Sequence, residues 1–284
     1  YTCNAADGFR SVNYASRNVL LGESIDTGIP ICHQSHGVGA LVFGEDGTLL
    51  VSCGDGAGFE NADMGGCVGG SSCSCLSDGI IADKEDVGAF RSQLIDSLSG
   101  KILRIDPATG NGVSNNPFYD SLAPRSPRSR VWALGMRNPF RFTLRPGTGS
   151  ANPASGDPGT IYLGDVGWRT WEELSVIKSG GRNLGWPAYE GMDAVTEYAP
   201  ENISNEDAPN PLFGTNQPGF GICNQRYFYF RNLIRQDTLS TPFFENPCNS
   251  GLAIPANIPK FIHKRPPFDW IHGGSQSRTS IYEG

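Results

Sequence analysis

Closely spaced turns are the feature that most constrains this chain. Glycine and proline account for 37 and 20 of its 284 residues. That is about a fifth of the chain, against an average of about 12 %. These residues interrupt the sequence every few positions and leave little room for long helices. We therefore expect many short elements joined by turns.

The segments between the turns have the length and composition of β-strands. They lie at 39–43 (GALVF), 48–53 (TLLVSC), 101–106 (KILRID), 130–136 (RVWALGM), 140–146 (FRFTLRP), 160–166 (TIYLGDV), 173–177 (ELSVI), 226–230 (RYFYF) and 279–284 (TSIYEG). Only 87–100 (VGAFRSQLIDSLSG) has helical spacing, with apolar residues from Phe90 to Leu98 on one side and Gly100 at its end. The sequence predicts an all-β fold.

A sandwich, a barrel and a propeller all agree with this pattern, and one recurrence favours the propeller. Segments 43–55 (FGEDGTLLVSCGD) and 156–167 (GDPGTIYLGDVG) both read as a glycine turn followed by a strand that ends in Gly-Asp. Propeller blades produce such repetition. The polar segments 107–130 and 193–222 read as long surface loops, so residues 1–284 are interpreted as a single domain.

Charge and cysteine content narrow the functional class. The net charge of −7 and the isoelectric point near 5.1 argue against a nucleic-acid partner. No apolar run reaches the length of a membrane span. Eight cysteines predict disulfides in a secreted, periplasmic or cell-surface protein, with the pairing left open. A metal knuckle at 67–75 is the alternative, but it lacks paired CxxC spacing and a nearby histidine.

Two histidines precede the first predicted hairpin, and an aspartate follows it. The turn at 45–47 (EDG) centres the pairing near residue 46, so His36 and Asp55 face each other at the open end. His33 lies three residues further out and has no such partner. We predict a dyad in which Asp55 fixes the tautomer of His36 and raises its basicity. The alternative is that both are ordinary loop residues.

Two further segments carry polar residues with binding potential. The acidic stretch 54–66 (GDGAGFENADMGG) lacks the ligand order of an EF-hand, so a solvated loop is favoured over a calcium site. Arg137 and Asn138 stand at a strand end just before a proline. Their side chains suit the carboxylates and carbonyls of a ligand.

Several long motifs, taken in order, resemble the glucose/sorbosone dehydrogenase family. They are 36–55 (HGVGALVFGEDGTLLVSCGD), 131–142 (VWALGMRNPFRF), 164–191 (GDVGWRTWEELSVIKSGGRNLGWPAYEG) and 269–284 (DWIHGGSQSRTSIYEG). The resemblance runs from about residue 18 to the end of the chain. It implies a six-bladed β-propeller of the quinoprotein type. About four blades are expected here, with the ring incomplete at both ends.

The resemblance also implies a cofactor and a reaction. The cofactor is pyrroloquinoline quinone (PQQ), held by a calcium ion, and the substrate is a sugar or related alcohol whose electrons pass to an external acceptor. His36 would be the general base, and Asp55 would support it. Arg137 and Asn138 would lie near the quinone and the substrate oxygen, with Trp270 and His272 facing the cofactor.

The implied metal ligands show one departure from the family pattern. The calcium beside the quinone would take the backbone carbonyls of Gly167 and Trp168, where the family has Gly-Pro. Glu172 and Glu173 match an acidic pair at which a second, structural calcium is implied. Because tryptophan replaces proline, a catalytically silent propeller that binds a protein or a glycan is the alternative. Relatives resembling Hedgehog-interacting protein provide the precedent for it.

Overall fold

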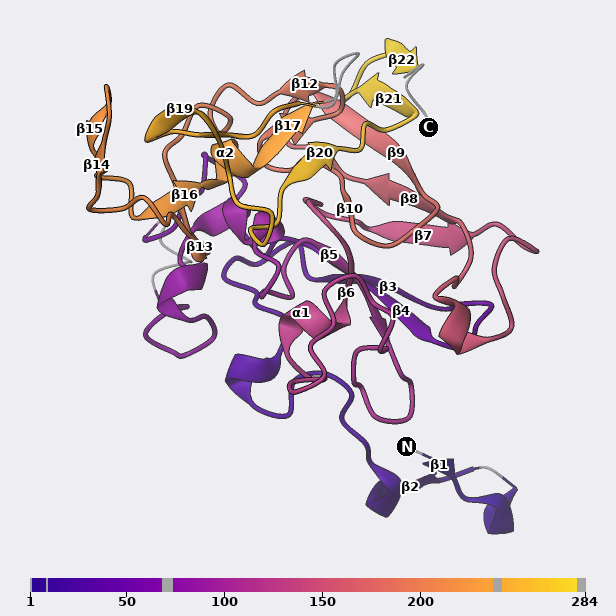
Figure 1. Ribbon diagram of the computed structural model, residues 1–284. Coiled ribbons are helices and arrows are strands. Elements are labelled where there is room, and N and C mark those ends of the chain that lie inside the picture. The colour runs from indigo at the N-terminus through magenta and orange to yellow at the C-terminus, as the bar shows by residue number, and fades with distance from the viewer. Residues whose placement is uncertain (1, 9, 68–73, 237–241, 280–284) are drawn as a thin grey trace.

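The computed structural model describes residues 2–8, 10–67, 74–236 and 242–279, and short strands dominate it (Figure 1). The strands of the larger sheet are β3 (Val38–Phe43), β4 (Leu49–Cys53), β5 (Lys101–Ile105), β6 (Val131–Leu134), β10 (Arg182–Asn183), β20 (Phe261–His263) and β17 (Ile234–Gln236). The second sheet contains β7 (Arg141–Leu144), β8 (Ile161–Asp165), β9 (Trp171–Ile177), β21 (Phe268–Ile271) and β22 (Ser277–Thr279).

Smaller elements complete the described part of the chain. Two-stranded sheets pair β1 (Thr2–Cys3) with β2 (Val12–Asn13), β11 (Tyr189–Glu190) with β12 (Asp193–Ala194), β13 (Ser204–Pro209) with β16 (Tyr227–Tyr229), β14 (Asn216–Gln217) with β15 (Gly221–Ile222), and β18 (Glu245–Asn246) with β19 (Asn249–Ala253). The helices are the single turns α1 (Pro127–Arg130) and α2 (Phe230–Leu233) and short 3₁₀ turns at Ala5–Asp7, Tyr14–Ser16, Ile25–Thr27, Asp83–Glu85, Gly88–Gln93 and Pro153–Ser155. The all-β class is confirmed.

Each large sheet contains a four-stranded antiparallel unit of the kind that builds a propeller blade. One unit is β3–β4–β5–β6 and the other is β7–β8–β9–β21. The larger sheet continues from β6 through β10, β20 and β17 by parallel pairing. None of the described sheets closes on itself, which agrees with an incomplete ring.

One apolar core joins the two sheets. Leu50 and Ile102 from the larger sheet pack with Phe142, Leu163 and Ile177 from the second. Burying each such side chain stabilises the fold by about 1.5–3 kcal/mol. A second cluster includes Trp168, Trp186, Tyr198 and Phe230, together with Ala57 from the segment after β4.

The predicted helix at 87–100 is wrong in type. Its first part is a 3₁₀ turn over Gly88–Gln93, and the chain becomes extended at Leu94. Long-range contacts hold this turn, because Arg91 Nη2 donates to Gly56 O at 3.1 Å and Gln93 Nε2 donates to Trp186 O at 2.6 Å. Tertiary contacts outweigh the apolar spacing here. The strand predicted at 279–284 lies outside the described residues except for Thr279.

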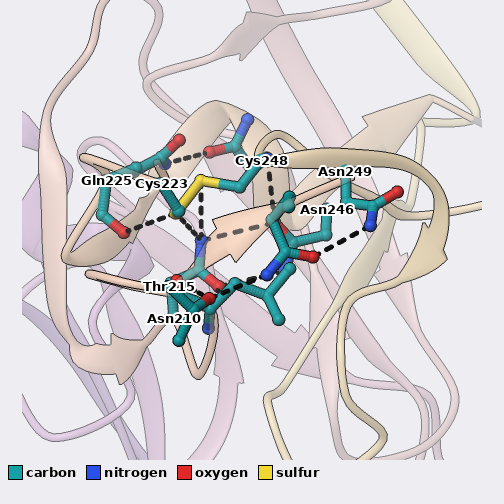
Figure 2. The surroundings of a disulfide bond; sticks show 10 residues. Asn210, Thr215, Cys223, Gln225, Asn246, Cys248 and Asn249 are labelled. Atoms are coloured by element: carbon teal, nitrogen blue, oxygen red, sulfur yellow. Dashed lines mark hydrogen bonds between the residues drawn. A yellow bond between two sulfur atoms is a disulfide. The ribbon is translucent and has the colours of Figure 1, made fainter. Parts of the chain in front are cut away.

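The expectation of disulfides is confirmed. Cys32 bonds to Cys75, Cys223 bonds to Cys248, and Cys67 is disulfide-bonded as well. Figure 2 shows the amide of Asn210 beside the Cys223–Cys248 bond. Within the described ranges, no helix is long and apolar enough to cross a bilayer.

Candidate functional site

The β3–β4 hairpin brings His36 and Asp55 together as the sequence predicts. Residues flanking the turn pair as Phe43 with Leu49. At the open end, His36 Nδ1 lies 2.7 Å from Asp55 Oδ1. Both side chains are buried, with Asp55 only 1 % exposed. Because a carboxylate can only accept, Nδ1 carries the proton in this contact.

The backbone at this point is unusual. His36 has φ 58, and it is the one non-glycine residue among those described with a positive φ. Such a conformation is disfavoured for an L-residue and persists only where its surroundings hold it. Gly54 makes this approach feasible, because a Cβ there would lie 2.3 Å from the carbonyl oxygen of His36. Gly54 N also donates to Gly37 O at 2.9 Å.

A tryptophan that sequence reasoning missed holds the second oxygen of Asp55. Trp186 Nε1 donates to Asp55 Oδ2 at 2.7 Å, and Ala57 N donates to Oδ1 at 3.0 Å. Burial raises the pKa of Asp55, but the charge interaction and hydrogen bond of His36, the charge of Arg137 and the hydrogen bond from Ala57 N outweigh it, so the pKa falls below its usual value. Asp55 is therefore a carboxylate at neutral pH. The motif around Trp186 was visible in the sequence, but nothing in it pointed the indole at Asp55.

Arg137 lies in the same cluster. Its carbonyl oxygen accepts from Asp55 N at 2.8 Å, and its guanidinium carbon lies 5.6 Å from the centre of the Trp186 ring. Its Nη1 donates to the carbonyl oxygens of Val166 and Gly167 at 3.0 and 2.8 Å. The guanidinium thus connects the Trp186 ring to the loop after β8, while the Arg137 backbone holds Asp55.

Asp165 fixes the backbone that carries Arg137 and Asn138. Its two carboxylate oxygens accept from Arg137 N at 3.0 Å and from Asn138 N at 2.7 Å. Burial raises the pKa of Asp165 to about 6, although these two hydrogen bonds oppose the shift. Asn138 is partly buried at this turn. The segment after β6 and the segment at the end of β8 therefore bind each other in both directions. The Asp165 carboxylate accepts from the N–H groups at 137–138, and the Arg137 guanidinium donates to the carbonyl oxygens at 166–167.

The predicted metal residues do not converge as a cluster of carboxylates. Glu172 accepts from Gly167 N at 3.0 Å, whereas the next residue, Glu173, is buried and accepts from Gly191 N. Burial raises the pKa of Glu173 well above its usual value, and nearby Asp165 adds to the shift. Trp168 packs inward and donates through Nε1 to Phe59 O at 2.7 Å. Within the described residues, no group of three or more His, Cys, Asp or Glu side chains could hold a metal ion.

Trp270 lies in β21 of the second sheet and His272 follows that strand, so neither belongs to the dyad's own hairpin. Trp270 pairs across strands with Glu172 and is 36 % exposed. His272 Nε2 lies 3.4 Å from Glu172 Oε1, and Glu172 in turn holds the Gly167 backbone. These two residues are thus linked to Arg137 through the loop after β8.

A family model and several curated proteins are similar to this chain. The Glucose / Sorbosone dehydrogenase family model matches residues 23–229. The HIPL2 protein of Arabidopsis thaliana is 29 % identical over 282 residues, which is 91 % of this chain and 33 % of that protein. The HIPL1 protein of the same plant is 26 % identical over 296 residues, or 94 % and 37 %. The chain thus spans about a third of the length of the curated relatives it matches.

Two solved structures are also similar. The PQQ-bound aldose sugar dehydrogenase of Streptomyces coelicolor has 27 % sequence identity and a TM-score of 0.36, over 60 % of this chain and 35 % of that one. A structure described as a glucose dehydrogenase has 22 % identity and a TM-score of 0.41, over 67 % and 41 %.

Proposed function

The chain belongs to the glucose/sorbosone dehydrogenase family, and from that premise we propose that it oxidises a sugar or a related alcohol in a PQQ-dependent reaction. The observation that carries the proposal is the buried contact of 2.7 Å between His36 and Asp55 at the end of the hairpin. PQQ, when bound, would supply the acceptor for the hydride of the alcohol. An external electron acceptor would then reoxidise it.

His36 is the proposed general base. Its Nε2 lone pair would take the proton of the substrate hydroxyl as the hydride leaves the carbon. The ionised Asp55 would stabilise the imidazolium that forms, and its bond to Nδ1 keeps the ring in the reactive tautomer. Trp186 would keep the carboxylate oriented, because its Nε1 holds the oxygen that His36 does not use. The protein thus needs few groups of its own for this step.

Arg137, Asn138, Trp270 and His272 are the residues proposed to hold the quinone. Arg137 adds a positive charge, and Trp270 adds an aromatic face that is partly exposed. Of these four, only Arg137 is in contact with the dyad's cluster. Trp270 in β21 and His272 just after it would therefore act from the second sheet.

A calcium ion is proposed at the backbone carbonyls of Gly167 and Trp168. Of these two oxygens, that of Gly167 accepts from the Arg137 guanidinium at 2.8 Å, so a positive group already lies at one of the proposed ligands. Carbonyl oxygens are suitable calcium ligands. Glu172 and Glu173 do not fit a second calcium, because Glu173 is buried against Gly191 while Glu172 binds Gly167 N.

The disulfides support a location in an oxidising compartment, and we propose a secreted, periplasmic or cell-surface protein. A small sugar or alcohol would be the partner.

Reconstitution tests the function directly. The protein would be loaded with PQQ and calcium and offered aldoses in a dye-reduction assay. We expect His36→Gln to lower turnover about 10²–10⁴-fold. His33→Gln is the matched control, since His33 is also buried but contacts Ser35 and the exposed Glu60. The absence of quinone-dependent dye reduction by the wild-type protein would reject the enzyme.

A binding module is the second candidate, and an exposed apolar surface favours it. Phe213, Phe220 and Ile222 are 47 %, 51 % and 64 % exposed on and beside the β14–β15 hairpin. The Cys223–Cys248 disulfide anchors this hairpin (Figure 2). Exposed apolar patches mark interaction sites. Binding of a protein or glycan that Phe220→Ser and Ile222→Ser abolish, in a protein without dehydrogenase activity, would favour this candidate.

A further inference from the structure

One asparagine motif lies outside the proposed dehydrogenase site. Asn202, Ile203 and Ser204 (NIS) match the pattern Asn-x-Ser/Thr, with x other than proline, in which the asparagine side chain can accept a glycan. The pattern occurs once in the 284 residues. Because three residues match such a pattern easily by chance, the position of the motif in the fold decides whether it can be used.

The acceptor side chain is open to solvent. Asn202 is exposed in the segment that leads into β13, and no hydrogen bond joins its carboxamide to another residue of the described ranges. Ser204 is half-buried at the start of β13, and its hydroxyl is equally without a described partner. Asn205 differs, because it is buried and its Oδ1 accepts from Asp207 N at 3.0 Å. The fold therefore uses the amide of Asn205 and leaves that of Asn202 available.

The middle residue of the motif anchors it to the protein. Ile203 packs against the cluster that contains Tyr198 and Phe230, and its carbonyl oxygen accepts from Phe230 N at 3.0 Å. Figure 1 shows β13 and β16 together at the side of the molecule from which the β14–β15 hairpin projects. A bulky, hydrated group on Asn202 could thus extend into solvent while Ile203 keeps its place in the core.

We propose that Asn202 carries an N-linked glycan. The donor is an oligosaccharide linked to a lipid diphosphate. Nδ2 of Asn202 forms a bond to C1 of the first sugar as the bond from C1 to the diphosphate oxygen breaks. The diphosphate leaves with the electron pair, the amide nitrogen gives up one proton, and no group is oxidised or reduced.

The disulfides agree with this modification. Cys32–Cys75 and Cys223–Cys248 require an oxidising compartment, and a protein that forms them on a secretory route also meets the machinery that attaches glycans to asparagine. The glycan does not depend on the proposed dehydrogenase reaction. It would be equally compatible with a binding module.

Peptide mass spectrometry tests the site on the unaltered protein, secreted from a eukaryotic cell culture. Peptide N-glycosidase in heavy-oxygen water releases an N-linked glycan and leaves a labelled aspartic acid in place of the asparagine. We expect the peptide that spans 202–204 to carry this label, and to be found at its unmodified mass in only a minor fraction before treatment. An unmodified peptide in the untreated protein, with no label after treatment, would overturn the proposal.

Variants of the motif give a second readout by gel mobility. Asn202→Gln and Ser204→Ala should both abolish the glycosidase-sensitive mobility shift, whereas Ser204→Thr should retain it because it keeps the hydroxyl. Asn224→Gln is the matched control, since Asn224 is also exposed but is followed by Gln225 and Arg226. It should leave the shift unchanged.

Thermal melting of the secreted variants would show that they are folded, and no loss is expected because neither motif side chain forms a described hydrogen bond. A glycosidase-sensitive shift that persists in Asn202→Gln would place the glycan elsewhere and overturn the assignment. Dye reduction by a protein without the glycan would reject this inference and leave the enzyme standing. A glycan at Asn202 in a protein without dehydrogenase activity would do the opposite.

Discussion

Two buried histidines in the described part of the chain have similar exposure and opposite surroundings. His36, 8 % exposed, has the carboxylate of Asp55 on its Nδ1. His263 in β20, 2 % exposed, has the ring of Tyr189 stacked at 4.6 Å and the amide of Gln236 at 3.3 Å. No described group forms a hydrogen bond with His263 Nε2. Burial lowers the pKa of His263 to about 3, so this ring stays neutral.

The difference teaches that burial alone does not make a histidine a base. A buried imidazole that must accept a proton needs a nearby negative charge to offset the cost of desolvation. Asp55 gives that charge to His36, whereas His263 has the positive Arg265 nearby, which lowers its pKa further. The surroundings of His263 and those of His36 meet at the adjacent residues Gly185 and Trp186. Gly185 packs against the His263 ring, and the next residue, Trp186, donates to Asp55.

Truncating the partner of each histidine gives the largest expected contrast. Asp55→Ala should lower the free energy of unfolding by about 3–5 kcal/mol, because it leaves buried donors of His36 and Trp186 without an acceptor. Gln236→Ala should cost only about 1 kcal/mol, since it removes neutral hydrogen bonds at a partly buried site. Urea unfolding at neutral pH would measure both. Equal losses would mean that Asp55 is no more than an ordinary buried polar residue.

Lowering the pH should destabilise the protein through His263, by a smaller amount than the Asp55→Ala substitution does. Because the pKa of His263 is about 3 when folded and about 6.5 when unfolded, the unfolded chain takes up a proton first as the pH falls. Stability from the neutral ring is complete above about pH 6.5 and is lost progressively down to about pH 3. At pH 5 the loss should be about 2 kcal/mol.

His263→Phe keeps a ring against Tyr189 and cannot titrate, so its unfolding free energy should fall less steeply between neutral pH and pH 5. Subtracting the unfolding free energies of the two proteins at each pH removes the contribution of every titrating group that both contain. Parallel pH curves would show that His263 is not the group responsible.

The sequence could predict the dyad because its geometry is local. A turn at Glu45–Gly47 and the pairing of the strands on either side of it are enough to place His36 opposite Asp55. The same reasoning could not find Trp186, which is 131 residues from Asp55 in the chain. Its position depends on how β6 and β10 pair in parallel, and no local pattern encodes that.

Other residues show the same limit. Arg137 was expected near the site and lies there, but its use of the 166–167 carbonyls depends on two loops from different strands. Glu172 and Glu173 were treated as a pair, although alternation along β9 sends neighbouring side chains to opposite faces. The apolar spacing at 87–100 indicated a helix because the contacts of Arg91 with Gly56 and of Gln93 with Trp186 are invisible in a local window.

The smallest expected effect tests whether the two regions are energetically separate. Trp186→Phe removes one hydrogen bond to the charged Asp55 while keeping an aromatic ring among Trp168 and Tyr198. It should cost about 1.5 kcal/mol. In double-mutant cycles, it should couple to Asp55→Asn by more than about 0.5 kcal/mol, because the two residues share a bond, and to His263→Phe by less than that. Strong coupling to His263→Phe would mean that the bend at Gly185 transmits strain between the regions, and the contrast between the two histidines would then describe one network rather than two.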